Sequence, residues 1–114
     1  MDGAALDGFC RALPGVTMDV LWGADDVYKV GGKMFAVMGP GGTLSFKAND
    51  VAFEMLTAEG GPGRPAPYMA RAKWVFFDSL EAVPEDDLKA YLRMAHELTA
   101  AKLTRKLRQS IGLA

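Results

Sequence analysis

The sequence predicts a single α+β domain in which helices cover one face of an antiparallel sheet. The chain has 114 residues, which is the usual size of a domain with one hydrophobic core. Two glycine-containing turns separate three short segments in which apolar and polar side chains alternate, as they do along strands. Segments with helical spacing precede, interrupt and follow these strands. The expected order is therefore α-β(3)-α-β(2)-α, with residues 1–114 forming one two-layer domain.

The N-terminal segment predicts a short amphipathic helix. Asp2 is a suitable N-cap, apolar residues recur at helical spacing up to Leu13, and Pro14 and Gly15 end the segment. Residues 16–21 are apolar and β-branched enough for a further short strand, and an acidic turn is expected at residues 24–26.

The strongest local signal is a hairpin centred on Gly31 and Gly32. Both glycines accept positive φ, so they suit a two-residue turn between strands at residues 27–30 and 33–38. The expected register pairs Tyr28 with Phe35. Since side chains alternate along a strand, one face should carry the core residues and the other the rest: Tyr28, Val30, Phe35 and Val37 on the first, Lys29, Met34, Ala36 and Met38 on the second.

The next elements follow from glycine, proline and capping signals. Residues 39–42 form a turn before a third strand at 43–47, and Asn49 or Asp50 caps a helix that runs to about residue 59. Pro65 and Pro67 restrict any strand at 64–70 to a short edge, because proline cannot donate to a ladder. Residues 74–78 are apolar on both faces and predict a well-covered strand.

One long helix is expected from residues 83–84 to about residue 108. Pro84 suits the first helical position, acidic residues follow at the positive end of the helix dipole, and basic residues lie at the other end. His96 falls on the polar stripe of this helix, so it is expected to be a solvated surface residue.

Charge and cysteine content exclude several classes of function. The net charge is −1, from 14 acidic and 13 basic residues, so only a local basic patch can attract a polyanion. Cys10 is the only cysteine, which excludes an internal disulfide and a multi-cysteine zinc site, and it is expected in the core. No apolar run approaches a membrane span and the N-terminus lacks signal-peptide features, so a cytoplasmic protein without a membrane partner is expected.

Four short motifs occur in order along the chain. They are Tyr28-Lys29-Val30-Gly31-Gly32-Lys33-Met34-Phe35-Ala36, Ser45-Phe46-Lys47-Ala48, Pro65-Ala66-Pro67-Tyr68-Met69 with Lys73-Trp74-Val75, and Ala101-Lys102-Leu103 with Lys106-Leu107. Together they resemble the MmcQ/YjbR-like family of small bacterial proteins over essentially the whole chain. The resemblance implies helices on one side of an antiparallel sheet, and members are often labelled DNA-binding proteins without an established catalytic activity. Ala95-His96 departs from the family pattern, which tends to have Ser-Tyr there.

No catalytic or metal site is predicted, and no cofactor is expected. The neighbours of His96 at helical spacing include no carboxylate or second imidazole. The acidic pair Asp25 and Asp26 fits a turn, and the acidic run at 85–87 fits a helix N-terminus. The glycine clusters lack the lysine and hydroxyl spacing of a phosphate-binding loop. The sequence therefore predicts a protein that is not an enzyme.

The sheet face that the helices leave open is the candidate binding surface. It would carry Lys29, Met34, Met38, Ser45 and Lys47, joined by either Trp74 with Phe76 or Val75 with Phe77. Such a surface can follow phosphates and stack on bases, or it can pack against a protein partner or a second copy of the chain. The structural alternative is an ordinary half-exposed sheet with solvated lysines.

With the family resemblance, nucleic acid becomes the leading partner. The candidate nucleic-acid-binding residues are Lys29, Lys33, Lys47, Arg71, Lys73 and Trp74. In this hypothesis the cationic side chains contact phosphates and Trp74 offers a stacking surface. The alternative is a protein-interaction or chaperone-like module that self-associates or binds a protein through the open sheet face.

Overall fold

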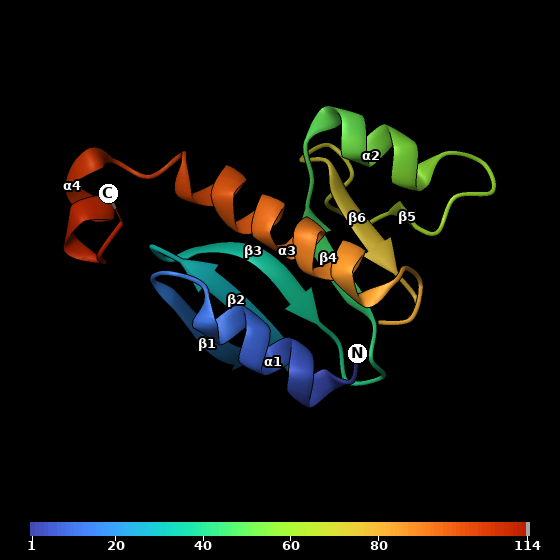
Figure 1. The fold of residues 1–114 in the computed structure, drawn as a ribbon, viewed down its shortest axis with the longest axis horizontal. Coiled ribbons are helices and arrows are strands. Elements are labelled where there is room, and N and C mark those ends of the chain that lie inside the picture. The colour runs from blue at the N-terminus through green and yellow to red at the C-terminus, as the bar shows by residue number, and fades with distance from the viewer. Residues whose placement is uncertain (114) are drawn as a thin grey trace.

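The computed structural model describes residues 1–113 and contains a six-stranded antiparallel sheet flanked by helices (Figure 1). Within this part of the chain the elements are α1 (Gly3–Ala12), β1 (Val16–Leu21), β2 (Asp25–Val30), β3 (Lys33–Met38), β4 (Leu44–Lys47), α2 (Asp50–Thr57), β5 (Arg64–Pro65), β6 (Trp74–Phe77), α3 (Glu85–Ala100) and α4 (Arg105–Ser110). The strand order across the sheet is β1-β2-β3-β4-β6-β5. The predicted fold class is confirmed, with 16–21 present as the additional strand.

The helices α1, α2 and α3 bury their apolar sides in one core. Figure 1 shows α1 and α3 lying side by side in front of the sheet. The core joins helix residues to one face of the strands, and its largest buried side chains include Leu6, Tyr28, Phe35, Phe46, Phe77, Leu88 and Leu92. Cys10 and the α2 residues Ala52 and Leu56 belong to the same core. The predicted arrangement, with helices on one face, is therefore confirmed.

The predicted capping and turn residues adopt their expected roles. Asp2 accepts a hydrogen bond from the Ala5 N–H at 2.8 Å, and Asn49 accepts one from the Ala52 N–H at 2.8 Å. Gly31 and Gly32 have φ values of 57° and 81°, the positive pair that a tight hairpin turn requires. These local signals fix where α1 and α2 begin and where β2 turns into β3.

The β2–β3 register differs from the prediction beyond the first two pairs. Lys29 pairs with Met34 as expected, but Tyr28 pairs with Ala36 because a β-bulge inserts Phe35 as an extra residue. Ala36 and Met38 consequently join the helix-covered core, and Val37 lies on the opposite face. The bulge allows Phe35 and its neighbour Ala36 to pack in the same core.

The predicted long C-terminal helix is two helices. Its first part, α3, ends at Ala100, and Thr104 starts α4 by accepting a hydrogen bond from the Leu107 N–H at 3.2 Å. A continuous helix would place Lys102 on the apolar stripe of α3, the side that carries Leu88, Leu92 and Ala95. The break places the buried Leu103 against the core instead, which accounts for the change in direction.

The second face of the sheet is partly covered, contrary to the prediction of an open surface. Residues 66–73 fold against it, and a smaller core cluster forms there from Val27, Val37, Ala66 and Trp74, with Met34, Met69 and Phe76 packed around it. Trp74 is only 5% exposed. Met38, which was expected on this face, lies in the other core. No helix of residues 1–113 is long and apolar enough to cross a membrane.

Candidate functional site

The antiparallel topology brings several segments to one end of the sheet. The β2–β3 hairpin turns there, β4 ends there at Lys47, and β6 begins there opposite Lys47. The C-terminal end of α3 reaches the same end, because a Cβ on Gly31 would lie 2.6 Å from Leu103 Cδ1. We call this the basic end, because it carries Lys33, Lys47, Arg71, Lys73, Lys102, Arg105 and Lys106.

Lys47 is the residue of the basic end that interacts with both Lys73 and Lys102. Its ammonium donates a hydrogen bond to the Ala72 carbonyl. Partial burial lowers the pKa of Lys47, the positive charges of Lys102 and Lys73 lower it further, and Asp50 acts in the opposite direction. The Lys47 ammonium is thus repelled by the positive charges of both Lys102 and Lys73.

The backbone fixes Lys73 next to Lys47. The Ala48 N–H donates to the Lys73 carbonyl at 3.0 Å, and the Lys73 ammonium lies 5.0 Å from the centre of the Phe53 ring. Lys73 has a φ of 61°, a left-handed conformation that is unusual for a residue with a side chain. Lys33 in the hairpin and Arg71 in the 66–73 segment are exposed. An anion could therefore meet several cations at this end.

Four of the six sequence-predicted residues are cations of the basic end, whereas Lys29 is ion-paired and Trp74, although it pairs with Lys47 across β4 and β6, is buried. Lys33, Lys47, Arg71 and Lys73 lie at the basic end. The ammonium of Lys29 forms an ion pair with Asp19 at 3.2 Å, so its charge is balanced. Trp74 is buried, which excludes it as a free stacking surface for a base.

Lys102, Arg105 and Lys106 are the basic-end residues that the sequence-based prediction did not include, and Lys102 is the one that acts on Lys47. In the predicted continuous helix, nothing in the sequence indicates that Lys102 lies near β4. The available signal was its position on the apolar stripe, which a lysine interrupts. The α3–α4 break turns this region toward the β2–β3 hairpin and brings Lys102 into electrostatic contact with Lys47.

The opposite end of the molecule is acidic. The strand ends and helix starts found there carry Asp25, Asp26, Asp78, Glu81, Glu85, Asp86 and Asp87. The N-terminal ammonium is held there by Glu81 at 3.3 Å and Glu85 at 3.7 Å. In Figure 1 the N-terminus and the start of α3 lie far from α4 and the β2–β3 hairpin. The net charge of −1 thus conceals a separation of positive from negative charge.

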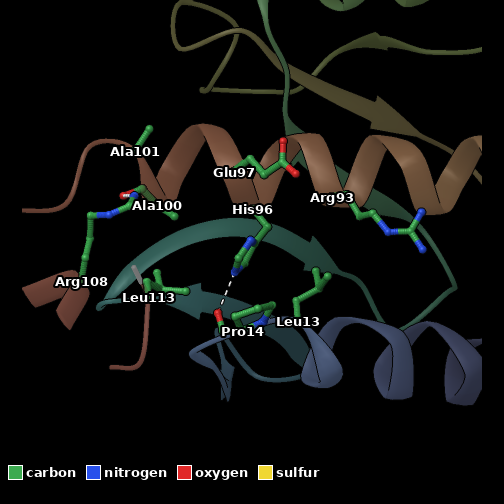
Figure 2. Close-up of a pocket in the computed structure, with 9 residues that line it drawn as sticks. All are labelled: Leu13, Pro14, Arg93, His96, Glu97, Ala100, Ala101, Arg108 and Leu113. Carbon is green, nitrogen blue, oxygen red and sulfur yellow. Dashed lines mark hydrogen bonds between the residues drawn. The ribbon is translucent and has the colours of Figure 1, made fainter. Parts of the chain in front are cut away.

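A pocket of about 460 Å³ lies between the end of α1, the C-terminal half of α3 and the C-terminal segment (Figure 2). Its lining residues are Leu13, Pro14, Arg93, His96, Glu97, Ala100, Ala101, Arg108 and Leu113. Its charged groups are held by α3 and α4, and most of its remaining wall is apolar.

His96 is buried in this region, so the prediction of a solvated surface residue is wrong. The side chain is 6% exposed, and its ring packs edge-on against Phe35 with the ring centres 5.5 Å apart. His96 Nε2 lies 2.7 Å from the Pro14 carbonyl oxygen. Because a carbonyl only accepts, Nε2 carries the hydrogen and donates it. The turn after α1 supplies this partner from 82 positions away in the sequence, which helical spacing does not reveal.

The described side chains offer little for covalent catalysis or metal binding. The Cys10 thiol is fully buried, and burial together with the charge of Asp7 raises its pKa to about 12, so the thiolate is scarce at neutral pH. The donating nitrogen of His96 faces a carbonyl rather than a nucleophile. Across residues 1–113, no three His, Cys, Asp or Glu side chains gather in a way that could hold a metal ion.

Comparison with known proteins agrees with the fold and identifies the family. The chain is similar to the crystal structure of a Deinococcus radiodurans protein with a DUF419 domain, with a TM-score of 0.84 and 24% sequence identity over 97% of this chain and 88% of that chain. At this identity the likeness shows the fold alone. No curated protein matches the sequence. The model of the YjbR family matches residues 11–98, well over half of the chain. The protein therefore belongs to the YjbR family.

Proposed function

We propose that the protein is a non-enzymatic binding domain that holds nucleic acid through phosphate contacts at its basic end. The observation that carries this proposal is the separation of charge in a nearly neutral chain. Cations from the β2–β3 hairpin, β4, the 66–73 segment and the region after α3 converge, while seven carboxylates lie at the other end. Phosphates that displace counterions from such a surface gain affinity through counterion release.

Lys47, Lys73 and Lys102 form the centre of the proposed interface. The positive charges of Lys102 and Lys73 disfavour the charged form of Lys47 in the free protein, and a phosphate placed beside Lys47 would offset this effect. Lys33 and Arg71 extend the surface on either side. Because members of the family are often labelled DNA-binding proteins, DNA is the preferred polymer in this proposal. We also propose a cytoplasmic location, where the protein would meet DNA.

Binding is expected to be independent of base sequence. The proposed contacts are ammonium and guanidinium groups, which position a nucleic acid through its backbone. Trp74 does not take part, because it is buried beneath residues 66–73. Lys29 contributes little, because Asp19 balances its charge.

Fluorescence anisotropy with a labelled 20-base-pair duplex and a single strand of the same length tests the proposal. We expect a Kd on the order of micromolar at 50 mM NaCl. If three phosphates are contacted, the affinity should fall about 40-fold at 200 mM NaCl, from a salt slope of about −0.9 per contact. The double variant Lys73→Gln, Lys102→Gln should flatten the slope by about 1.8.

Lys89→Gln provides the matched control for these lysine substitutions. Lys89 lies near the start of α3 and pairs with Glu85 at 3.5 Å, so its loss should leave DNA affinity unchanged. Failure to bind either polymer at 50 mM NaCl would refute the proposal. So would binding that the Lys73 and Lys102 substitutions leave as strong as before.

A protein-interaction module is the second candidate. The observation in its favour is the exposure of Val51 at 75% and Met55 at 61% on α2, since large apolar side chains gain from being covered. The sheet face offers less apolar surface than the sequence suggested, because residues 66–73 cover part of it. Sedimentation that reveals salt-insensitive self-association, together with no DNA binding, would favour this candidate.

A further inference from the structure

The pocket between α1, α3 and the C-terminal segment adjoins the basic end, because Lys102 follows its lining residue Ala101, but its lining contains none of the lysines of the proposed function. Its volume of about 460 Å³ is in the range of small-molecule sites. Leu13, Pro14, Ala100, Ala101 and Leu113 give it carbon-rich walls. These walls come from three segments that are distant in sequence and meet around His96 (Figure 2).

His96 holds the two sides of the pocket together. Its buried ring packs on Phe35, and its Nε2–H donates to Pro14 at 2.7 Å, so α3 is tied to the turn after α1. Arg108 fixes the C-terminal side, because its Nη1 donates to the Ala100 carbonyl at 2.7 Å. The walls are therefore held in place before any ligand arrives, which limits the entropy lost on binding.

The charged residues of the pocket lining are two arginines and one glutamate, at different positions around the pocket. Figure 2 shows Arg93 and Arg108 on opposite sides of His96, whereas the carboxylate of Glu97 points away from His96 and Pro14. The guanidinium of Arg93 lies 5.1 Å from the centre of the Phe9 ring, and within residues 1–113 it forms no ion pair. Its planar donors therefore remain available to a carboxylate at the rim of an apolar pocket.

We propose that this pocket binds a small molecule with a flat apolar body and a carboxylate. The apolar body lies against Leu13, Ala100 and Leu113, and the carboxylate meets Arg93. Arg93 supplies one principal cationic contact, which matches a ligand with a single carboxylate. This site does not depend on nucleic-acid binding at the basic end.

Titration of the amide NMR spectrum with 2-naphthoate and with its neutral analogue 2-naphthamide tests the proposal. We expect 2-naphthoate to shift the amide signals of Leu13, Ala100, Ala101 and Leu113 with a Kd on the order of 0.1 to 1 mM. The amide analogue should bind about three- to fivefold more weakly, because the ion pair lies at an exposed rim.

Two substitutions separate the roles of charge and cavity. Arg93→Gln should remove the preference for 2-naphthoate and leave 2-naphthamide binding unchanged. Ala101→Trp, at an exposed position of the lining, should fill the pocket and weaken both probes. Arg64→Gln, on the edge strand β5, removes a cation that pairs with Asp78 and should change neither affinity. The absence of shifts at 5 mM probe, equal affinity for the two probes, or an undiminished preference in Arg93→Gln would overturn the proposal.

Discussion

Asp7 connects the first helix to the sheet through a single carboxylate. It accepts a hydrogen bond from the buried Tyr28 hydroxyl at 2.8 Å and pairs with Arg11 Nε at 2.9 Å. Burial by itself raises the pKa of Asp7, but the bonds from Tyr28 and Arg11 outweigh it and hold the pKa below its ordinary value. Burial and the same bond raise the pKa of Tyr28. The hydroxyl is therefore a permanent donor at neutral pH.

Asp7→Ala should lower the free energy of unfolding at pH 7 by about 1–2 kcal/mol, because the buried Tyr28 hydroxyl loses its acceptor. The pKa of Asp7 is lower in the folded than in the unfolded chain, so the charge contributes fully above about pH 4. That contribution is lost as the pH falls through the folded pKa. Urea unfolding at several pH values from 7 to 2.5 should therefore show that the difference in the free energy of unfolding between wild type and Asp7→Ala becomes smaller as the pH falls.

Tyr28→Phe controls for the partner of Asp7. Combined with Asp7→Ala, it removes the unpaired hydroxyl, so the double variant should be less destabilised than the sum of the single variants. If the difference in the free energy of unfolding between wild type and Asp7→Ala stays constant down to pH 2.5, the charge of the Asp7 carboxylate does not stabilise the fold as proposed.

His96 illustrates what a single helix cannot reveal about its own residues. Leu88, Leu92, Ala95 and Thr99 recur at helical spacing and lie on the buried side of α3. His96 is also buried, because the turn after α1 presents the Pro14 carbonyl at that position. Helical periodicity carries no information about this partner. A polar side chain can thus belong to a core when a distant backbone group satisfies it.

At the scale of elements, the β2–β3 hairpin and the α3–α4 break depend on one another. Leu103 is 7% exposed and lies against the hairpin turn. A Cβ on Gly31 would lie 2.6 Å from Leu103 Cδ1, whereas a Cβ on Gly32 would meet nothing within 4 Å. Both glycines have positive φ, so their backbone requirements are similar and only the packing against Leu103 distinguishes them.

Gly31→Ala should therefore destabilise the protein more than Gly32→Ala. Each substitution places alanine at positive φ, at a cost of about 1–2 kcal/mol, and Gly31→Ala adds overpacking of about 1–3 kcal/mol. Thermal unfolding of the two variants measures the difference. Leu103→Ala in the Gly31→Ala background should recover part of the added loss. Equal destabilisation by the two glycine substitutions would show that Leu103 does not press on the turn.

The β-bulge marks a limit of pattern reading in strands. The turn glycines and the first pairs of the hairpin follow from the sequence, because they depend on local backbone geometry. The extra residue at Phe35 cannot be predicted from the sequence. The residues on either side of Phe35 are equally compatible with a strand in which side chains alternate strictly between the two faces. One inserted residue reverses every later side chain of β3, which is why Val37 and Met38 exchange faces.

At the scale of the whole molecule, the distribution of charge matters more than its sum. The sequence suggests Lys47 as a residue of the predicted open sheet face, and it suggests Lys33, Arg71 and Lys73 as basic residues at exposed tips. Lys102 enters only through the α3–α4 break, and the placement of residues 66–73 decides that Trp74 is covered. The composition gives a nearly neutral chain, because the positive charges at one end of the fold and the negative charges at the other cancel in the net charge.

This separation predicts that the protein binds to a phosphate-bearing resin even though its net charge is −1. At pH 7 and 0.1 M salt, the basic end should face phosphocellulose while the acidic end points into solution, because screening limits repulsion to about 10 Å at this salt concentration. Lys73→Gln combined with Lys102→Gln should elute at lower salt. The charge-matched control, Lys89→Gln with Arg64→Gln, changes the net charge equally, but removes cations that Glu85 and Asp78 already pair. Equal loss of retention in both double variants would mean that net charge, rather than its arrangement at one end of the sheet, governs the interaction with phosphates.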